Sequence, residues 1–133
     1  MLDIETLFAS AHKVRLKAHA PYSNFLVGAA IEDESGNLHI GCNVENAAFP
    51  SGVCAEGGAI GAMIALGGKH IVKIAIVGGA RGEDVLPSCL PCGGCRQRIW
   101  EFARADTQIL VQTSDQEIVS YTPEDLLPEG FRL

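Results

Sequence analysis

The sequence lacks an excess of positive charge. It contains ten Lys and Arg residues against sixteen Asp and Glu, which gives a net charge of −6 over 133 residues. Proteins that bind nucleic acids draw most of their affinity from clustered Lys and Arg on phosphates. The longest basic cluster, Lys13, Arg15 and Lys17, instead suits the C-terminal end of a helix. We therefore expect no nucleic acid polymer as a partner.

Long hydrophobic runs are also absent. No apolar stretch approaches the roughly 20 residues that a membrane-spanning helix needs, and the acidic start of the chain does not read as a signal peptide. Linkers, repeats and low-complexity segments are missing, and the length is typical of one domain. The expectation is a cytoplasmic protein with no membrane partner, folded as a single domain over residues 1–133.

Cysteine is present, but in an odd number that does not indicate disulfide bonds. In a reducing compartment, thiols are better interpreted as metal ligands or catalytic groups. The sequence has five of them, Cys42, Cys54, Cys89, Cys92 and Cys95. We interpret Cys42 as a buried small apolar residue.

The hydrophobic pattern alternates between helical and extended periods, which predicts an α/β fold. Helical patterns cover residues 3–18, 54–66, 93–103 and 123–127, and strand patterns cover 25–31, 38–45, 71–77, 108–112 and 117–121. We expect one five-stranded mixed sheet with helices on both sides, a three-layer α/β/α arrangement. The second helix contains Gly57, Gly58 and Gly61, and this indicates close approach of another helix or of a neighbouring subunit.

The strand predicted over residues 38–45 places Asn43 and Glu45 on one face, because side chains alternate along a strand. One interpretation is a solvated sheet face. The other is a pair of polar groups that binds vicinal hydroxyls.

Two short cysteine motifs carry the chemistry. Cys54-Ala55-Glu56 and Pro91-Cys92-Gly93-Gly94-Cys95 each begin a predicted helix, where the partial positive charge of the helix N-terminus favours the metal-binding thiolate. Three thiolates suit a zinc ion, and an open fourth position for water is typical of a catalytic zinc site. Glu56, two residues from Cys54, is the candidate for handling the protons of that water.

Other interpretations of the cysteines remain open. A C-x-x-C pair alone also occurs in redox proteins and in structural zinc knuckles, and Cys89 extends the second motif to C-x-x-C-x-x-C. The histidines lack ligand spacing, and we expect them to be surface or hydrogen-bonded residues: His12, His19, His39 and His70.

The combination of motifs resembles the small, homotetrameric cytidine deaminases over essentially the whole chain. Zinc deaminases are known by an H-x-E…P-C-x-x-C signature, and here cysteine stands in place of the histidine, as in the three-cysteine members. The matching stretches are residues 20–25, 27–30, 41–47, 54–56, 91–97 and 126–128.

The resemblance implies a mechanism. Zinc bound by Cys54, Cys92 and Cys95 lowers the pKa of a bound water, Glu56 transfers its proton to N3 of cytosine, and the resulting hydroxide attacks C4. Glu56 then delivers a second proton to the leaving amine, and ammonia departs.

The resemblance also implies the substrate contacts. It assigns Asn43 and Glu45 to the ribose, Phe25 to the face of the pyrimidine, and the backbone of Ala55 to its polar edge. Phe131 resembles the aromatic residue that closes over the base of a neighbouring subunit. The alternative for Phe25 and Phe131 is an ordinary core residue and a frayed tail.

Two positions depart from the family pattern. Many members carry Arg after the catalytic Glu, where this chain has Gly57, and many carry Tyr where it has Phe49. A zinc ion on three thiolates keeps a net negative charge. We expect either a weaker Lewis acid or compensation by helix N-termini and Arg96.

The leading function is deamination of cytidine and deoxycytidine in pyrimidine salvage, by a zinc-dependent hydrolase. The first alternative is a blasticidin S-type aminopyrimidine nucleoside deaminase, and the second is a structural zinc module without catalysis. A redox protein would leave Cys54 and Glu56 unexplained, and the acidic charge disfavours a polynucleotide deaminase. Asn43 and Glu45 favour the leading function over the first alternative, and Glu56 argues against the second alternative, because a structural site needs no general base.

Overall fold

The structure is a computed structural model that describes residues 1–133. Its elements follow the predicted order. They are α1 (Ile4–Arg15), β1 (Phe25–Asp33), β2 (Leu38–Cys42), the 3₁₀ turn η1 (Phe49–Ser51), α2 (Ala55–Ala65), β3 (Ile71–Ala80), α3 (Gly93–Phe102), β4 (Ala103–Gln112), β5 (Ile118–Tyr121) and α4 (Pro123–Leu126).

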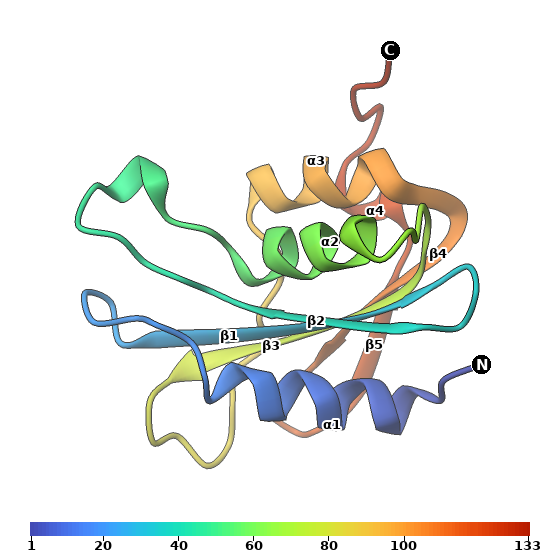
Figure 1. Ribbon diagram of the computed structural model, residues 1–133. Helices are drawn as coiled ribbons and strands as arrows, with labels where there is room; N and C mark the ends of the chain where they lie inside the picture. Colours follow the sequence, from blue (N-terminus) through green and yellow to red (C-terminus); the bar gives the residue numbers. More distant parts are fainter.

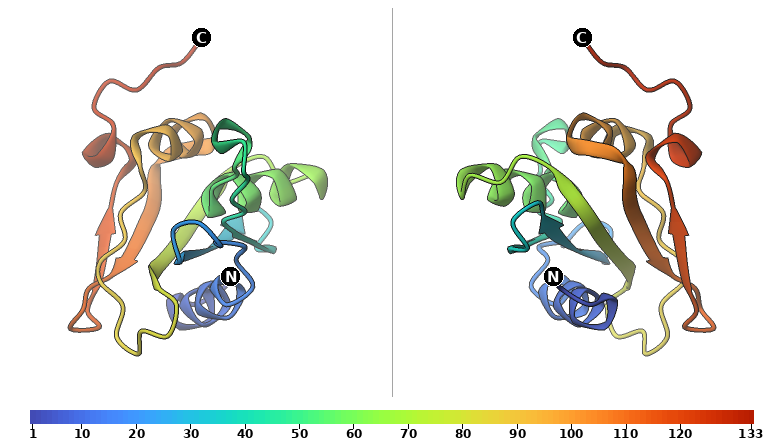
Figure 2. Two further views of the ribbon diagram at one scale, coloured as in Figure 1. Left: turned by 90° about the vertical axis from the view of Figure 1, so that its left-hand side faces the viewer. Right: turned by 90° about the vertical axis from the view of Figure 1, so that its right-hand side faces the viewer.

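The five strands form one sheet in the order β2-β1-β3-β4-β5. Strands β3 and β4 are parallel, and all other neighbours are antiparallel. Helix α1 covers one face, while α2, α3 and α4 cover the other (Figures 1 and 2). The predicted three-layer α/β/α architecture with a mixed sheet is confirmed. None of the helices combines the length and the hydropathy that crossing a membrane requires.

Each face of the sheet has its own hydrophobic core. The core on the α1 side contains Leu7, Phe8, Ala11, Ala30, Ala75, Val77 and Leu110. The larger core, under α2 and α3, draws alternate residues from the same strands, among them Ala29, Ile31, Ile74, Ile76 and Ile109. This alternation is the period-two signal of a strand covered on both faces.

Helix α1 is fixed at both ends. Asp3 caps it by accepting a hydrogen bond from the Thr6 amide at 2.7 Å. Arg15, near its C-terminal end, is buried and donates to the carbonyls of Leu26, Gly79 and Ala80. Arg15 therefore ties α1 to the ends of β1 and β3.

Strand β2 differs from the prediction. It ends at Cys42, and its apolar residues Leu38 and Ile40 are exposed, whereas His39 is buried. His39 Nε2 lies 2.7 Å from the buried Asp33 carboxylate. His39 belongs to the face of β2 that was also interpreted as solvated, together with Asn43 and Glu45. That interpretation is wrong for His39, because α2 packs on this side of the sheet.

Strand β4 begins five residues earlier than predicted, at Ala103, directly after α3. Ala103 pairs with Ile71, and the register then shifts before Lys73 pairs with Gln108. The sequence from 103 to 107 carries no alternating pattern, and this tertiary pairing decides its structure.

Gly41 allows α2 to lie directly on β2. A Cβ atom at residue 41 would be 2.4 Å from the Ala59 nitrogen and 2.5 Å from the Ala55 oxygen, both in the backbone of α2. Gly58 lies opposite Gly41 on α2. A Cβ atom at residue 58 would be 3.7 Å from the Gly41 Cα, which is an ordinary van der Waals distance.

Gly41→Ala and Gly58→Ala form a matched pair that tests this contact. We expect Gly41→Ala to lower the free energy of unfolding by about 2–3 kcal/mol, because backbone atoms must move apart. Gly58→Ala should raise it by about 0.5–1 kcal/mol through helix propensity. Urea unfolding of both variants measures the difference, and equal effects would contradict the close approach.

Candidate active site

The first helical turns of α2 and α3 carry the predicted zinc ligands. Cys54 is the N-cap residue of α2, and its sulfur accepts a hydrogen bond from the Gly57 amide at 3.2 Å. Cys92 is the N-cap residue of α3, and Cys95 lies in its first turn. The two helices lie side by side on one face of the sheet (Figure 1).

Three of the predicted groups meet. The ligand atoms of Cys54, Glu56 and Cys95 all lie within 4.8 Å of one another. The Cys95 thiol donates to the Cys54 sulfur at 2.8 Å. Glu56 is 4% exposed and Cys95 is 1% exposed, so the cluster is largely closed to bulk water.

The electrostatics of the cluster favour ionisation of Cys54 and oppose ionisation of Cys95 and Glu56. The hydrogen bond from Cys95 lowers the pKa of Cys54 to about 6, and the same bond raises the pKa of Cys95. Burial raises the pKa of Glu56 above its ordinary value. A carboxyl group with a raised pKa can both accept and release a proton near neutral pH.

The thiols of the cluster fit a zinc ion. Thiolate sulfur is an established zinc ligand, and the proton shared by Cys54 and Cys95 is released when the thiols bind metal. Zinc is the cofactor that these thiols hold, and Glu56 lies beside them as a carboxyl group that can handle protons.

Cys92 and Cys89 lie outside the 4.8 Å group. Cys92 is exposed, with its sulfur 3.9 Å from the position that a Cβ on Gly94 would take. The Cys89 sulfur instead packs near Gly78, beside the ring of Phe25, and burial raises its pKa to about 11. Cys89 is thus a protonated thiol at neutral pH.

Asn43 and Glu45 both hold the backbone that leads into β1. The Asn43 amide accepts from the Val27 nitrogen at 2.8 Å and donates to the Phe25 oxygen at 2.9 Å. One Glu45 carboxylate oxygen accepts from the amides of Tyr22 and Ser23, and the other bonds to the Ser23 hydroxyl.

These bonds leave some capacity unused. Asn43 keeps a second N–H donor, and the Glu45 carboxylate keeps lone pairs. The Ser23 hydroxyl lowers the pKa of Glu45, which keeps this acceptor ionised. The pair can therefore still donate to and accept from a hydroxyl group.

Ala55 lies within the cluster, as the buried first residue of α2 between Cys54 and Glu56. Phe25 begins β1 and is partly exposed, and its ring lies near Gly78 beside the Cys89 sulfur.

Phe131 is exposed, at 65%. Gln97 on α3 bonds to both its backbone nitrogen and its backbone oxygen. Arg132 next to it donates to the Trp100 oxygen and lies 5.0 Å from the centre of the Trp100 ring. Sequence reasoning gave Gln97 no role, although it ends a matching stretch, and missed Trp100 and Arg132, which no motif spacing marks. These contacts hold residues 131 and 132 against α3, and the chain end extends beyond that helix (Figure 1).

The Arg96 guanidinium bonds to backbone carbonyls and not to the thiols. It donates from Nε to the Pro91 oxygen and from Nη1 to the Leu126 oxygen, and so joins α3 to α4. Arg98, two residues further on, is a smaller contributor to the lowered pKa of Cys54.

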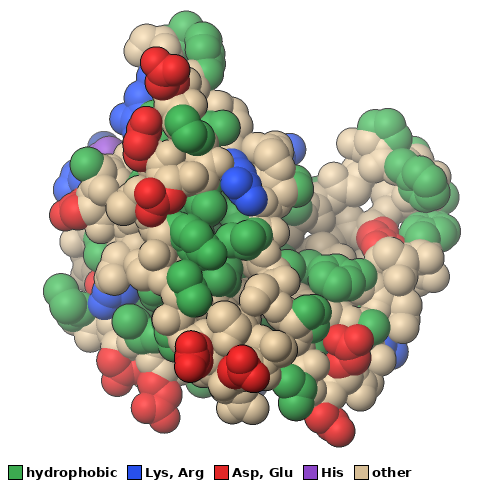
Figure 3. Space-filling model, turned by 180° about the vertical axis from the view of Figure 1, so that it is seen from behind, with side chains coloured by type: hydrophobic (Ala, Val, Ile, Leu, Met, Phe, Trp, Pro, Cys, Tyr) green, Lys and Arg blue, Asp and Glu red, His purple; other side chains and the backbone are tan.

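Two open pockets flank the cluster. One, of about 490 Å³, is lined by Cys54, Gly57 and Arg98, among others. The other, of about 450 Å³, is lined by Glu45 and Phe49, among others. Seen from behind, the segment around η1 projects from the body and carries hydrophobic side chains, with a hollow beside it (Figure 3).

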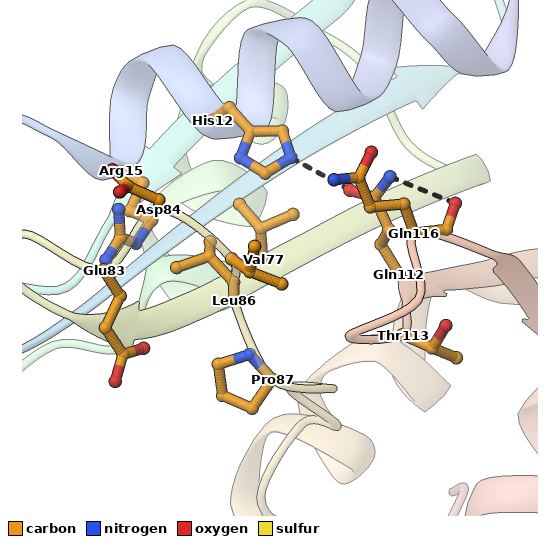
Figure 4. Close-up of a pocket in the computed structure, with 11 residues that line it drawn as sticks. His12, Arg15, Val77, Glu83, Asp84, Leu86, Pro87, Gln112, Thr113 and Gln116 are labelled. Carbon is orange, nitrogen blue, oxygen red and sulfur yellow. Dashed lines mark hydrogen bonds between the residues drawn. The ribbon is translucent and has the colours of Figure 1, made fainter.

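A third pocket, of about 220 Å³, lies against α1 on the opposite face of the sheet (Figure 4). It contains none of the cysteines. His12 and Gln112 bond to each other across it at 3.0 Å. This pocket is separate from the chemistry of the thiol cluster.

Comparison with known proteins defines the class. The profile of the family described as "Cytidine and deoxycytidylate deaminase zinc-binding region" matches residues 1–112. A cytidine deaminase of Sporosarcina psychrophila is 35% identical over 130 residues, which cover 98% of this chain and 92% of the relative.

Solved structures agree. A cytidine deaminase from Burkholderia pseudomallei has a TM-score of 0.86 and 34% identity, over 98% of this chain and all of the other. A cytidine deaminase from Mycobacterium leprae has a TM-score of 0.81 and 36% identity, and the match covers 97% of this chain and 100% of the other. The chain belongs to the cytidine and deoxycytidylate deaminase zinc-binding family.

The serine variants of Cys92 and Cys89 decide the third zinc ligand. We expect Cys92→Ser to lose most of its zinc, because the centre then keeps only two thiolates, while Cys89→Ser retains it. Zinc counted per chain by atomic absorption after dialysis makes the comparison. Zinc loss in Cys89→Ser and retention in Cys92→Ser would reverse the assignment.

Proposed function

We propose that this protein is a zinc-dependent hydrolase that converts cytidine and deoxycytidine to uridine and deoxyuridine with release of ammonia, a reaction of pyrimidine salvage. The observation that carries the proposal is the buried Glu56 carboxyl group, with a raised pKa, beside the thiols of Cys54 and Cys95. The family and its structural neighbours support the same reaction.

Zinc, when bound, lowers the pKa of a water molecule and stabilises negative charge that develops on oxygen. Cys54, Cys95 and, as the third thiolate, Cys92 are the residues that hold it. The N-termini of α2 and α3 favour their ionised form.

Glu56 moves the protons. It accepts one from the attacking water and delivers it to N3 of the cytosine ring, so that the oxygen bonds to C4. It then takes the proton of the hydroxyl now on C4 and transfers it to the amine, the C4–N bond breaks, and ammonia leaves while C4=O forms. Burial of Glu56 favours this double use, because desolvation raises its pKa and makes the carboxylate a stronger base.

Substrate recognition falls to residues around this carboxyl group. Asn43 and Glu45 bind the ribose hydroxyls through the N–H donor and the lone pairs that their bonds to the backbone leave free. Phe25 packs beside the pyrimidine, and the Ala55 backbone contacts its polar edge. A site built to hydrogen-bond hydroxyl groups discriminates against a substrate that lacks them.

The protein acts as a cytoplasmic homotetramer in which residues 1–133 of each copy form one catalytic domain and Phe131 covers the base bound by a neighbour. Exposed apolar side chains near the site support this assembly: Tyr22, Val44, Phe49, Val53 and Phe131. The outer face of α2 adds Gly61, which has no atom within 4 Å of an added Cβ, and Ile64. Such a surface is typical of a protein–protein interface.

The variant Glu56→Gln tests the reaction. The amide keeps the size of the carboxyl group but cannot shuttle protons, so we expect uridine formation from cytidine to fall roughly a thousandfold while zinc stays bound. Ultraviolet absorbance follows the reaction, and the free base cytosine serves as a substrate control. A wild-type protein that holds zinc and leaves cytidine and deoxycytidine unchanged would refute the proposal.

Phe131→Ala tests the shared site. We expect the KM for cytidine to rise about five- to tenfold with zinc content unchanged, because an aromatic contact with the base is lost. Sedimentation of the wild type should give the mass of four chains. A single-chain mass, or an unchanged KM, would contradict the neighbour's contribution.

A further inference from the structure

Two glycines leave room for the Arg98 side chain between the ends of α2 and α3. A Cβ atom on Gly57 would be 3.6 Å from Arg98 Cδ and 3.8 Å from its Nε. One on Gly94 would be 2.9 Å from Arg98 Nη1. A side chain at residue 94 would force the guanidinium to move, and one at residue 57 would contact it directly.

The same two glycines lie against two different cysteines. The Cβ position of Gly57 is 3.1 Å from the Cys54 sulfur, and that of Gly94 is 3.9 Å from the Cys92 sulfur. Arg98 therefore has one nitrogen near the Cys54 side of the centre and another near the Cys92 side. It spans the two helix ends that supply the thiols.

Arg98 has no other partner in the chain. It donates no side-chain hydrogen bond, in contrast to Arg96, and the two ion pairs of the structure involve other residues. No carboxylate therefore pairs with its positive charge within the chain, and this charge acts on the Cys54 sulfur, with which Arg98 shares a pocket.

We propose that Arg98 is a positioning residue of the metal centre, whose charge offsets that of the thiolates across the gap between α2 and α3 and so strengthens zinc binding. The inference rests on the proposed function, because it takes Cys54, Cys92 and Cys95 as the zinc ligands. A metal held by three thiolates keeps a net negative charge, and a nearby cation stabilises it.

Zinc affinity, measured by competition with a coloured chelator, tests the proposal without any activity assay. The variants are Arg98→Gln, which removes the charge, and Arg98→Lys, which keeps it. Arg104→Gln removes an exposed arginine at the start of β4 and is the matched control. Circular dichroism confirms that each variant is folded.

We expect Arg98→Gln to bind zinc about tenfold more weakly at low salt, Arg98→Lys to stay within about twofold of the wild type, and Arg104→Gln to match it. Because Arg98 is exposed, the effect of Arg98→Gln should shrink in about 1 M NaCl, where the screening length is only about 3 Å.

Each contrary outcome overturns the proposal. If Arg98→Gln binds zinc as tightly as the wild type, Arg98 has no role at the metal centre. If its zinc affinity falls equally at low and high salt, or if Arg98→Lys loses as much affinity, the effect comes from packing and not from charge. A wild type that binds no zinc ends the proposed function as well. If the wild type binds zinc and deaminates cytidine, and Arg98→Gln binds zinc equally well, only the inference about Arg98 fails and the proposed function stands.

Discussion

The burial of the Glu56 carboxyl group beside two sulfur atoms is the constraint on which the rest of the structure depends. Bringing three acidic groups into a closed site is costly unless positive charge or metal compensates for it. The fold meets this constraint with two helix N-termini on one face of the sheet. Gly41 lets α2 lie against the edge strand β2, and the parallel pair β3 and β4 requires a crossover, α3, which lies beside α2.

The sequence predicted most of the fold because periodicity and turn chemistry act locally. The strands of the central sheet and the four helices are all present. Two details could not be predicted. The first is which face of β2 is covered, because α2 buries His39 and leaves Leu38 and Ile40 exposed. The second is the start of β4, which depends on pairing between Ala103 and Ile71.

Of the candidate site, the structure bears on one part. Cys54, Glu56 and Cys95 lie together because both cysteine motifs stand at helix starts that the fold places side by side, while Cys92 lies outside this group and its role stays a prediction. Spacing did not predict that Asn43 and Glu45 hold the turn before Phe25, since this needs the chain from 22 to 27 to lie beside them. Arg98 was missed because it lies three residues beyond Cys95, outside every motif, and only the tertiary contact with Gly57 relates it to the thiols.

The charge distribution also bears on the charge of the substrate. Glu45 is kept ionised by the Ser23 hydroxyl, and the whole chain carries a net charge of −6. With Glu45 on the ribose, as proposed, an uncharged nucleoside enters without repulsion, whereas a phosphate on its sugar would bring further negative charge toward this carboxylate. The electrostatics around Glu45 therefore favour nucleosides over nucleotides as substrates.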